Sequence, residues 1–414
     1  MVQLLDLPPE LIQEICRQCL RPSSEFHSPS SPVLASLART CSTLRAYAQP
    51  ELYCAPSPYR YNYVALVRTL VKRPDLAQLV QDMVIGDDWS RSDDRGLLPD
   101  DVQLFEALMA KYPAKDGKPV EISTHWWETV RDNRQRDRLF DCDPEAALAS
   151  LVVTQIPNVE SLDITAGYFW EFPFSTPASL SCLKKLSLRH ADTELGTNTD
   201  VVKNILLAAP KLDSFYGTML CRVDDGFQHD NLTEFHLEFS SLEEQSFQNI
   251  ARGLPKLKSF AYSSGGAIIS DDPEATPGEM IRALLRCAST LEHMSLDIED
   301  AWYFEDFGPN DWISDLKGMR HLKTLLLSSS TMDIEESDRN LLTDMLPASI
   351  HKLTLINAPE RIMDAFGRLA ENADSFLNLV DLLLVGAKDD YLRDVQAIFK
   401  TTKINVSAQQ EGPC

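Results

Sequence analysis

Histidines, cysteines and paired acids are the side chains through which this 414-residue chain could carry out chemistry. Four of its eight histidines fall in or beside expected β-strands, where a row of imidazoles on one face could bind a metal ion. These four are His190, His236, His293 and His351. They occupy different positions within their strands, so we interpret them as solvated or hydrogen-bonded side chains and expect no metal site.

The cysteine pattern gives no clear reactive site either. Cys16 and Cys19 form a Cys-x-x-Cys pair, but a structural zinc needs a second ligand pair nearby, and a redox motif needs a βαβ setting. Neither accompanies the pair, so we interpret both residues as free thiols on the apolar side of a helix. Cys182, Cys221 and Cys287 lack an evident base partner.

Other catalytic signatures are missing from the sequence. Acidic pairs at 224–225, 271–272 and 389–390 fall in turns, where Asp is a common turn former, and they do not follow the fixed pattern of a calcium loop. The chain contains no phosphate-binding loop, dinucleotide fingerprint, serine-hydrolase elbow or zinc-protease motif. We therefore expect a protein that is not an enzyme, with no catalytic residues and no cofactor.

Composition excludes further classes. With 39 Lys and Arg against 62 Asp and Glu, the net charge is −23, which argues against a nucleic-acid backbone binder. No apolar run reaches the roughly 18 residues of a membrane span, and the first residues lack the basic segment of a secretory signal. Nine cysteines without framework spacing are typical of a reduced intracellular protein, which we expect in the cytoplasm and/or nucleus.

An apolar pattern recurs from about residue 155 onward. Each copy has three apolar positions, the second three residues and the third five residues after the first. Copies begin 20 to 34 residues apart, about 28 on average, close to the roughly 20–29 residues of a leucine-rich repeat. Alternation of the last two positions with polar residues predicts a strand with one buried face. The copies are Val159-Leu162-Ile164, Leu183-Leu186-Leu188, Leu212-Phe215-Gly217, Leu232-Phe235-Leu237, Leu257-Phe260-Tyr262, Leu291-Met294-Leu296, Leu322-Leu325-Leu327, Ile350-Leu353-Leu355 and Leu379-Leu382-Leu384.

Helix-like segments alternate with these strands. Because one strand and one helix per copy bury a continuous core only by stacking, the pattern predicts an α/β fold. We expect an irregular leucine-rich-repeat solenoid, curved, with parallel strands on its concave side and helices on its convex side. The turn position that usually holds Asn is small in seven of nine copies, so no Asn ladder is expected. The expected helices cover 200–209, 243–253, 277–288, 337–346 and 359–373.

The first fifty residues have a different pattern. Pro8 and Pro9 suit the opening of a helix, and Leu11, Ile12, Ile15 and Cys16 then form one broad apolar stripe. After a Ser- and Pro-rich loop over 21–32, a second amphipathic helix is expected to run to a stop at Pro50, with Leu34, Leu37, Ala38, Cys41, Leu44 and Ala48 on one face. Two short helices make no stable core alone, so the stripe needs a partner, in this chain or another protein.

The residue order in this region resembles an F-box. The resemblance rests on Leu7-Pro8-Pro9-Glu10-Leu11-Ile12-Gln13-Glu14-Ile15, then Leu37-Ala38-Arg39-Thr40-Cys41-Ser42-Thr43-Leu44-Arg45, then Pro50-Glu51-Leu52-Tyr53. It implies docking on the Skp adaptor of a cullin-RING ubiquitin ligase. By this resemblance, the interface or the small core behind it would comprise Leu7, Pro8, Leu11, Ile12, Ile15, Leu37, Cys41 and Leu44. Together with the irregular repeats, the chain resembles the F-box/leucine-rich-repeat proteins common in fungi.

These patterns divide the chain into four segments. Residues 1–54 form the F-box-like helical motif, with a net charge of −1. Residues 55–155 contain a linker helix over 61–73, a first repeat turn at Val80-Met83-Ile85 and a charged insertion over 86–142. The solenoid covers 156–405, and 406–414 form a C-terminal tail.

A surface for a protein substrate is expected on the solenoid. Its concave face includes His236 and leans acidic around Glu234, Glu238, Asp297 and Glu299. Because parallel strands send their following loops to one edge, two aromatic loops should share a rim. These loops contain Tyr168, Phe169 and Trp170, and Trp302, Tyr303, Phe304 and Trp312. They either bind a partner or fold back over the core, and we hypothesise that they capture a basic, partly apolar segment.

The resemblance implies a substrate-recognition subunit of an SCF-type (Skp-cullin-F-box) ubiquitin ligase. The F-box would hold the Skp adaptor, and through it the cullin-RING ligase, while the repeats hold a protein substrate near a conjugating enzyme. The alternative is a non-catalytic leucine-rich-repeat scaffold that acts outside a ubiquitin ligase. Exposure of Leu11, Ile12 and Ile15 would favour docking, and burial within the chain would favour the scaffold.

Overall fold

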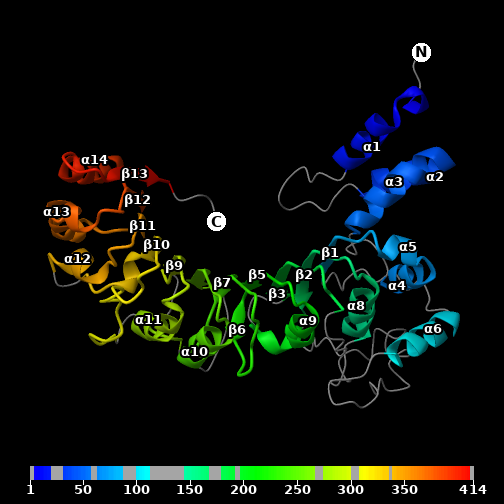
Figure 1. Cartoon of the computed structure of the whole chain (residues 1–414), viewed down its shortest axis with the longest axis horizontal. Helices are drawn as coiled ribbons and strands as arrows, with labels where there is room; N and C mark the ends of the chain where they lie inside the picture. Colours follow the sequence, from blue (N-terminus) through cyan, green and yellow to red (C-terminus); the bar gives the residue numbers. More distant parts are fainter. Residues whose placement is uncertain are drawn as a thin grey trace. The chain divides into compact units, whose positions relative to one another are not determined.

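A computed structural model of the chain has an α/β fold with a large parallel sheet (Figure 1). It describes residues 4–19, 31–56, 63–86, 99–111, 144–166, 179–191, 196–265, 274–299, 307–334 and 338–410. The chain divides into two compact units, Met1–Ala191 with Val201–Leu212, and Asp192–Asp200 with Asp213–Cys414. Among the described residues, no helix is both long and apolar enough to cross a membrane.

Three helices open the first unit. After a 3-10 turn over Leu4–Asp6, helix α1 covers Pro9–Gln18, and its early prolines are tolerated because the first amides of a helix need no intrahelical partner. Helices α2 (Ser31–Thr40) and α3 (Ser42–Cys54) follow. Together the three helices surround a small core of Cys16, Leu34 and Ala48.

The prediction of a single helix ending at Pro50 is wrong in two respects. The chain breaks at Cys41, whose backbone is extended at φ −156° and whose Sγ accepts a hydrogen bond from the Leu44 amide at 3.5 Å. Such a side-chain cap starts a new helix. Helix α3 then continues through Pro50, which lacks an amide donor. Packing of Leu52 on the small core offsets part of the free energy lost with that backbone hydrogen bond.

The rest of the first unit combines helices with three strands. Strands β1 (Asp82–Ile85), β2 (Ser161–Ala166) and β3 (Lys185–His190) pair in parallel in chain order, with Met83, Leu162 and Leu186 in register and buried. Met83 and Ile85 of the predicted first repeat turn therefore lie on a strand. The helices are α4 (Tyr63–Lys72), α5 (Pro74–Ala77), α6 (Pro99–Met109), α8 (Pro144–Gln155) and α9 (Lys203–Ala208).

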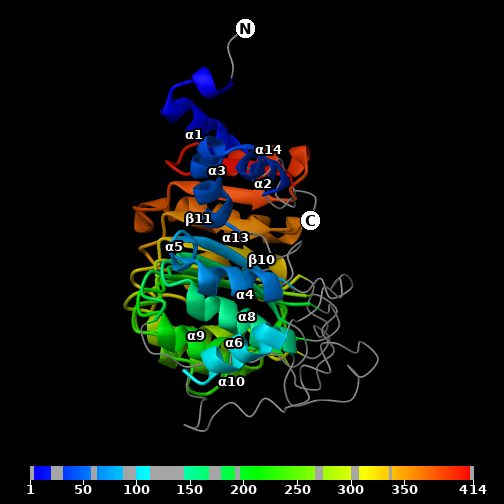
Figure 2. The same cartoon turned by 90° about the vertical axis from the view of Figure 1, so that its right-hand side faces the viewer.

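An ion pair and apolar packing join these helices. Both views place α4 beside α8 (Figures 1 and 2). The Arg68 Nε donates to Asp101 Oδ1 at 2.6 Å, linking α4 to α6, and Asp101 is buried. Apart from α6, the predicted insertion over 86–142 lies outside the described residues.

The second unit contains the longer run of parallel strands. All neighbours follow chain order, as expected when each strand returns through a crossover on the same side. A short parallel pair, β4 (Thr197–Asn198) with β6 (Leu220–Arg222), was not predicted. The main strands are β5 (Ser214–Thr218), β7 (Glu234–Ser240), β8 (Ser259–Ser264), β9 (His293–Asp297), β10 (Thr324–Ser328), β11 (Lys352–Ile356), β12 (Asp381–Val385) and β13 (Asn405–Gln409).

Helices occupy the crossovers between these strands (Figure 1). Helix α11 starts with a capping box, in which Thr276 and Glu279 satisfy each other's backbone amides. The helix expected over 337–346 shortens to α12, and the last crossover adds a helix, α14, that was not predicted. The bounds are α10 (Glu244–Gly253), α11 (Pro277–Leu284), α12 (Leu341–Met345), α13 (Met363–Glu371) and α14 (Asp389–Phe399).

The predicted apolar triads form the core in register. Phe215, Phe235 and Phe260 stack across β5, β7 and β8, with ring centroids 5.0 and 6.4 Å apart and planes within 10°. From β9 to β12 the equivalent positions are buried Met and Leu residues. The expected tail from residue 406 is wrong: Val406 is buried, and β13 pairs with β12, because Asn405–Gln409 continue the alternation.

Serine hydroxyls replace the missing Asn ladder at three places. Ser240 Oγ accepts the Leu220 amide at 3.1 Å, Ser263 Oγ accepts the Phe239 amide at 3.1 Å, and Ser328 Oγ accepts the Ile298 amide at 3.0 Å. In each case, a serine at or near the end of one strand accepts from an amide at or just after the end of the preceding main strand. We call this set of three bonds the hydroxyl ladder. At Leu220 and Ile298 it satisfies backbone donors that would otherwise be buried without a partner, and at Phe239 it bonds the amide of an exposed turn.

A left-handed residue follows several strands. Met219, Phe239 and Asn357 have φ of 61°, 47° and 50°, and Gly265 and Gly386 also have positive φ. Phe239 lies at a bulge, where Leu237 and Ser240 of β7 pair with Tyr262 and Ser264 of β8. The strand exits are therefore built from one recurrent turn conformation.

Candidate functional site

Helix α1 presents an apolar face that the described part of the chain leaves uncovered. Leu11 and Ile15 lie one turn apart and are 50% and 39% exposed, whereas Ile12 and Cys16 on the adjoining row are 4% and 1% exposed. Residues four apart share one side of a helix, so the broad predicted stripe is split into a buried row and an exposed row. Leu4, Leu5 and Val33 are also exposed. We call these five residues, Leu4, Leu5, Leu11, Ile15 and Val33, the N-terminal apolar surface.

Packing behind this surface holds it in place. Partly buried Leu37, Tyr47 and Leu52 pack around the small core of Cys16, Leu34 and Ala48. Arg17 of α1 pairs with Glu51 of α3 at 3.3 Å, and Arg45 Nε donates to the Ala38 carbonyl at 2.9 Å, joining α3 to α2. The apolar surface therefore sits on helices whose arrangement is set within the chain.

The eight residues predicted for adaptor binding separate into two groups. Pro8, Leu11 and Ile15 are exposed. Ile12 and Leu44 are buried, Leu7 and Leu37 are half-buried, and half-buried Cys41 caps α3. The structure thus places three of the eight where a partner could touch them and gives most of the others a supporting position. Leu4, Leu5 and Val33 were missed, because Leu4 and Leu5 precede the predicted helix and Val33 is outside the apolar face predicted for the second helix.

A second cluster of polar and aromatic side chains lies on β5, β7 and β8. Glu234 Oε2 accepts hydrogen bonds from Ser214 Oγ at 2.7 Å and from the Tyr216 hydroxyl at 3.3 Å. The Tyr216 and His236 rings meet edge to face, with centroids 5.1 Å apart. His236 Nε2 lies 3.0 Å from Ser259 Oγ. In parallel register, Tyr216 is beside His236, so the cluster follows directly from strand pairing.

The electrostatics of this cluster suit binding better than proton transfer. Burial lowers the pKa of His236, against the opposing effect of Glu234 and Glu238. Burial, then Glu234, raises the pKa of the Tyr216 hydroxyl. Although a Ser–His contact occurs in nucleophilic sites, the Glu234 carboxylate is bonded to Ser214 and Tyr216 and does not orient the imidazole. The cluster presents a carboxylate and aromatic rings, and carboxylates and ring faces both favour cationic groups.

The C-terminal end of β7 extends this cluster. Glu238 is exposed, and the neighbouring Phe239 is 44% exposed in its left-handed conformation. We call Tyr216, Glu234, His236, Glu238 and Phe239 the acidic–aromatic patch. Phe239 was missed because it stands outside the apolar triad, and its sequence carries no signal for a bulge.

Asp297 lies apart from this patch. It is on β9 and pairs in register with Ser263 of β8. Its Oδ1 accepts the Glu299 amide at 3.2 Å, and Glu299 in turn accepts Ser329 Oγ at 3.2 Å and Asn357 Nδ2 at 3.1 Å. Glu234, His236 and Glu238 are thus brought together on one strand, whereas Asp297 belongs to a separate hydrogen-bonded group after β9.

Of the seven residues predicted for the aromatic loops, the structure describes one, Trp312. Tyr168, Phe169, Trp170, Trp302, Tyr303 and Phe304 lie outside the described residues. Trp312 is half-buried and meets Phe307 edge to face, with centroids 4.9 Å apart. This pair shows one aromatic of the second loop packed against its neighbour.

Neither comparison with known proteins nor the arrangement of possible metal ligands assigns a function to these surfaces. No family model matches the chain, and no curated protein matches it significantly. Within the described part of the chain, no group of three or more His, Cys, Asp or Glu side chains is arranged to hold a metal ion. Cys16 and Cys19 are not joined by a disulfide bond, and burial raises the pKa of the Cys16 thiol.

Proposed function

We propose that this protein is a non-catalytic substrate-recognition subunit of an SCF-type ubiquitin ligase. The observation that carries the proposal is the N-terminal apolar surface: Leu11 and Ile15 are exposed on a helix whose other row is already buried. An exposed apolar face on a preorganised support is typical of a protein interaction site. The resemblance of the same residues to an F-box indicates the Skp adaptor as the partner.

The size of the surface fits a specific effect on affinity. Complete burial of a Leu or Ile side chain is worth about 1.5–3 kcal/mol. Leu11 and Ile15 are 50% and 39% exposed, so covering both contributes about 1.3–2.7 kcal/mol. Loss of both contacts then weakens binding roughly ten- to hundredfold. A carboxylate at either position would add a desolvation penalty.

The substrate surface in this proposal is the acidic–aromatic patch. We propose that the parallel strands and crossover helices form a leucine-rich-repeat solenoid, whose exposed strand face receives the substrate. Glu234 and Glu238 would pair with Lys or Arg, and Tyr216 and Phe239 would cover apolar parts of the same segment. Catalysis would consist of bringing a substrate lysine near the conjugating enzyme.

The test measures binding of the full-length protein to purified Skp adaptor by calorimetry. Wild type should bind, and the Leu11→Asp/Ile15→Asp variant should lose binding while its circular dichroism stays unchanged. Leu207→Asp is the matched control, since Leu207 is 57% exposed on α9 of the same unit. Tyr216→Ala should also leave adaptor affinity unchanged, because it belongs to the proposed substrate surface.

Two outcomes would reject the adaptor assignment. One is absence of binding by the wild-type protein, and the other is undiminished binding by the double variant. Burial of Ile12 and Leu44 within the chain is the observation that favours the alternative, a repeat scaffold acting outside a ubiquitin ligase. That alternative would then stand.

A further inference from the structure

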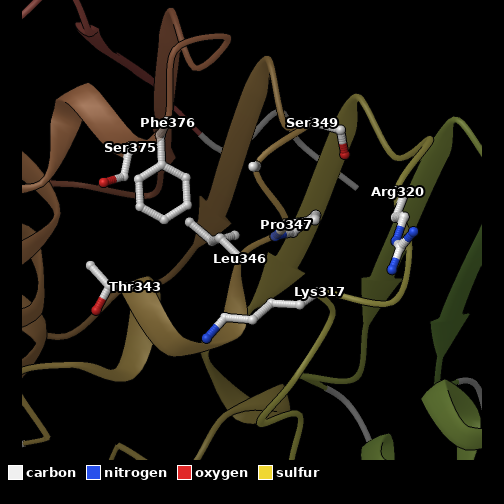
Figure 3. Close-up of a pocket in the computed structure, with 9 residues that line it drawn as sticks. Lys317, Arg320, Thr343, Leu346, Pro347, Ser349, Ser375 and Phe376 are labelled. Atoms are coloured by element: carbon white, nitrogen blue, oxygen red, sulfur yellow. The ribbon is translucent and has the colours of Figure 1, made fainter.

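A hollow of about 460 Å³ opens in the second unit (Figure 3). Three chain segments contribute to it: the turn before β10, the end of α12 with the turn before β11, and the turn before β12. It lies in the same unit as the acidic–aromatic patch and shares no residue with it. Its volume is within the roughly 300–1,000 Å³ of small-molecule sites.

The floor of the hollow is apolar and preformed. Leu346, Pro347 and Phe376 are buried, and Figure 3 shows Leu346 and Pro347 between Phe376 on one side and Arg320 on the other. Backbone hydrogen bonds fix these turns, with the Leu346 amide bonded to the Leu342 carbonyl at 3.0 Å and the Phe376 amide to the Ala373 carbonyl at 3.2 Å. A ligand would therefore find its contact surface already assembled.

The charged side chains at the rim, and not the hydroxyls of Thr343 and Ser349, point to an anion. Thr343 and Ser349 donate their hydroxyl protons to the carbonyls of Asn340 and Leu322, at 2.9 and 2.8 Å, so only their lone pairs remain. Lys317 Nζ lies 3.6 Å from Asp344 Oδ1, a long contact with an exposed carboxylate.

Arg320 supplies the main charge. Its guanidinium has no ion-pair partner within the part of the chain that the structure describes. A guanidinium offers two parallel N–H donors to a carboxylate or phosphate. The chain has a net charge of −23, but the two charged side chains that line this hollow, Lys317 and Arg320, are both cationic.

We propose that this hollow binds a small organic anion, with an apolar body on Leu346, Pro347 and Phe376 and a carboxylate or phosphate held by Arg320. The amphiphilic ligand follows from the combination of surfaces. Apolar burial provides contact area, and the charge-assisted bonds fix orientation. This proposal is independent of the N-terminal apolar surface.

Calorimetry on the full-length protein tests it with four probes. Phenyl phosphate and benzoate carry the two possible anionic groups on one apolar body. Benzyl alcohol keeps the ring without charge, and inorganic phosphate keeps the charge without the ring. At least one aryl anion should bind clearly more tightly than both of these partial probes, and the stronger of the two identifies the preferred anionic group.

Variants locate the binding. Arg320→Gln should weaken it about tenfold or more, because a hydrogen bond to a charged group is worth about 1.5–3 kcal/mol. Ala348→Trp should abolish it by filling the hollow from an exposed lining position. Arg286→Gln is the control, at an exposed arginine outside the hollow. The proposal is overturned if neither aryl anion binds at millimolar concentration, or if Arg320→Gln and Ala348→Trp bind as wild type does.

Discussion

Removing one hydroxyl of the ladder tests whether it holds the strand exits together. In Ser240→Ala, the Leu220 amide loses its acceptor at 3.1 Å, and the Glu238 carbonyl loses one donor at 3.0 Å but keeps the Met219 amide, also at 3.0 Å. Both Ser240 and Leu220 are fully buried, so water does not replace the lost partner. A buried donor left without a partner costs about 1–3 kcal/mol.

Ser263→Ala is the matched comparison. It removes an equivalent bond of 3.1 Å, to the Phe239 amide, but Phe239 is 44% exposed and water can reach this turn. We expect a loss of about 0.5 kcal/mol, near the lower end for an intramolecular hydrogen bond. The two variants should therefore differ by about 1 kcal/mol or more in the free energy of unfolding.

Two measurements check this difference. Urea unfolding followed by circular dichroism gives the relative free energies, and hydrogen exchange reports the protection of the Leu220 amide. Ser240→Ala should lower both, while Ser263→Ala should leave the Leu220 amide protected. Equal losses of stability, or unchanged protection of Leu220 in Ser240→Ala, would refute the reasoning.

Two further predictions concern packing and pH. Gly367→Ala should stabilise the folded protein by about 0.5–1 kcal/mol, because Gly367 lies inside α13 with nothing within 4 Å of an added Cβ. Gly253→Ala should destabilise it strongly, because the added Cβ would lie 1.8 Å from the Phe227 carbonyl oxygen. Thermal melts of the two variants and wild type measure the difference. Burial raises the pKa of Glu274 from 4.5 to about 7, against a hydrogen bond with Ser241, so the folded state binds this proton more tightly than the unfolded chain. Its stabilising effect is full below pH 4.5 and is lost as the pH rises through 7, so between pH 5 and 8 the melting temperature should fall more for wild type than for Glu274→Gln.

The sequence predicted the strands well because their signal is local. In the triad Ile350-Leu353-Leu355, the last two residues alternate with polar neighbours. The register of β10, β11 and β12 aligns these positions. The break at Cys41 and the continuation through Pro50 depended on a side-chain cap and on packing of Leu52. The cap joins Cys41 to Leu44 through a polar contact that apolar periodicity does not show, and the packing of Leu52 on the small core involves residues far apart in the chain.

The candidate sites were predictable only in part. Helical periodicity placed Leu11, Ile12 and Ile15 on one stripe, but the choice of which row is buried depends on where α2 and α3 pack. Strand alternation placed Glu234 and His236 on one face, because residues two apart on a strand point to the same side of a sheet. Phe239 entered the patch through a bulge and a positive φ, which its residue type opposes.

The left-handed residues after the strands also constrain how such a chain can change in length. They stand seven residues after the first apolar residue of the triad at 219, 239, 357 and 386, and eight after it at 265. The spacing between triads, in contrast, varies from 20 to 34 residues. Length differences within this chain therefore fall in the crossovers, while the distance from the first triad residue to the strand exit is nearly constant. A change in length is expected to be tolerated in a helical crossover and to be disruptive between the triad and the exit turn.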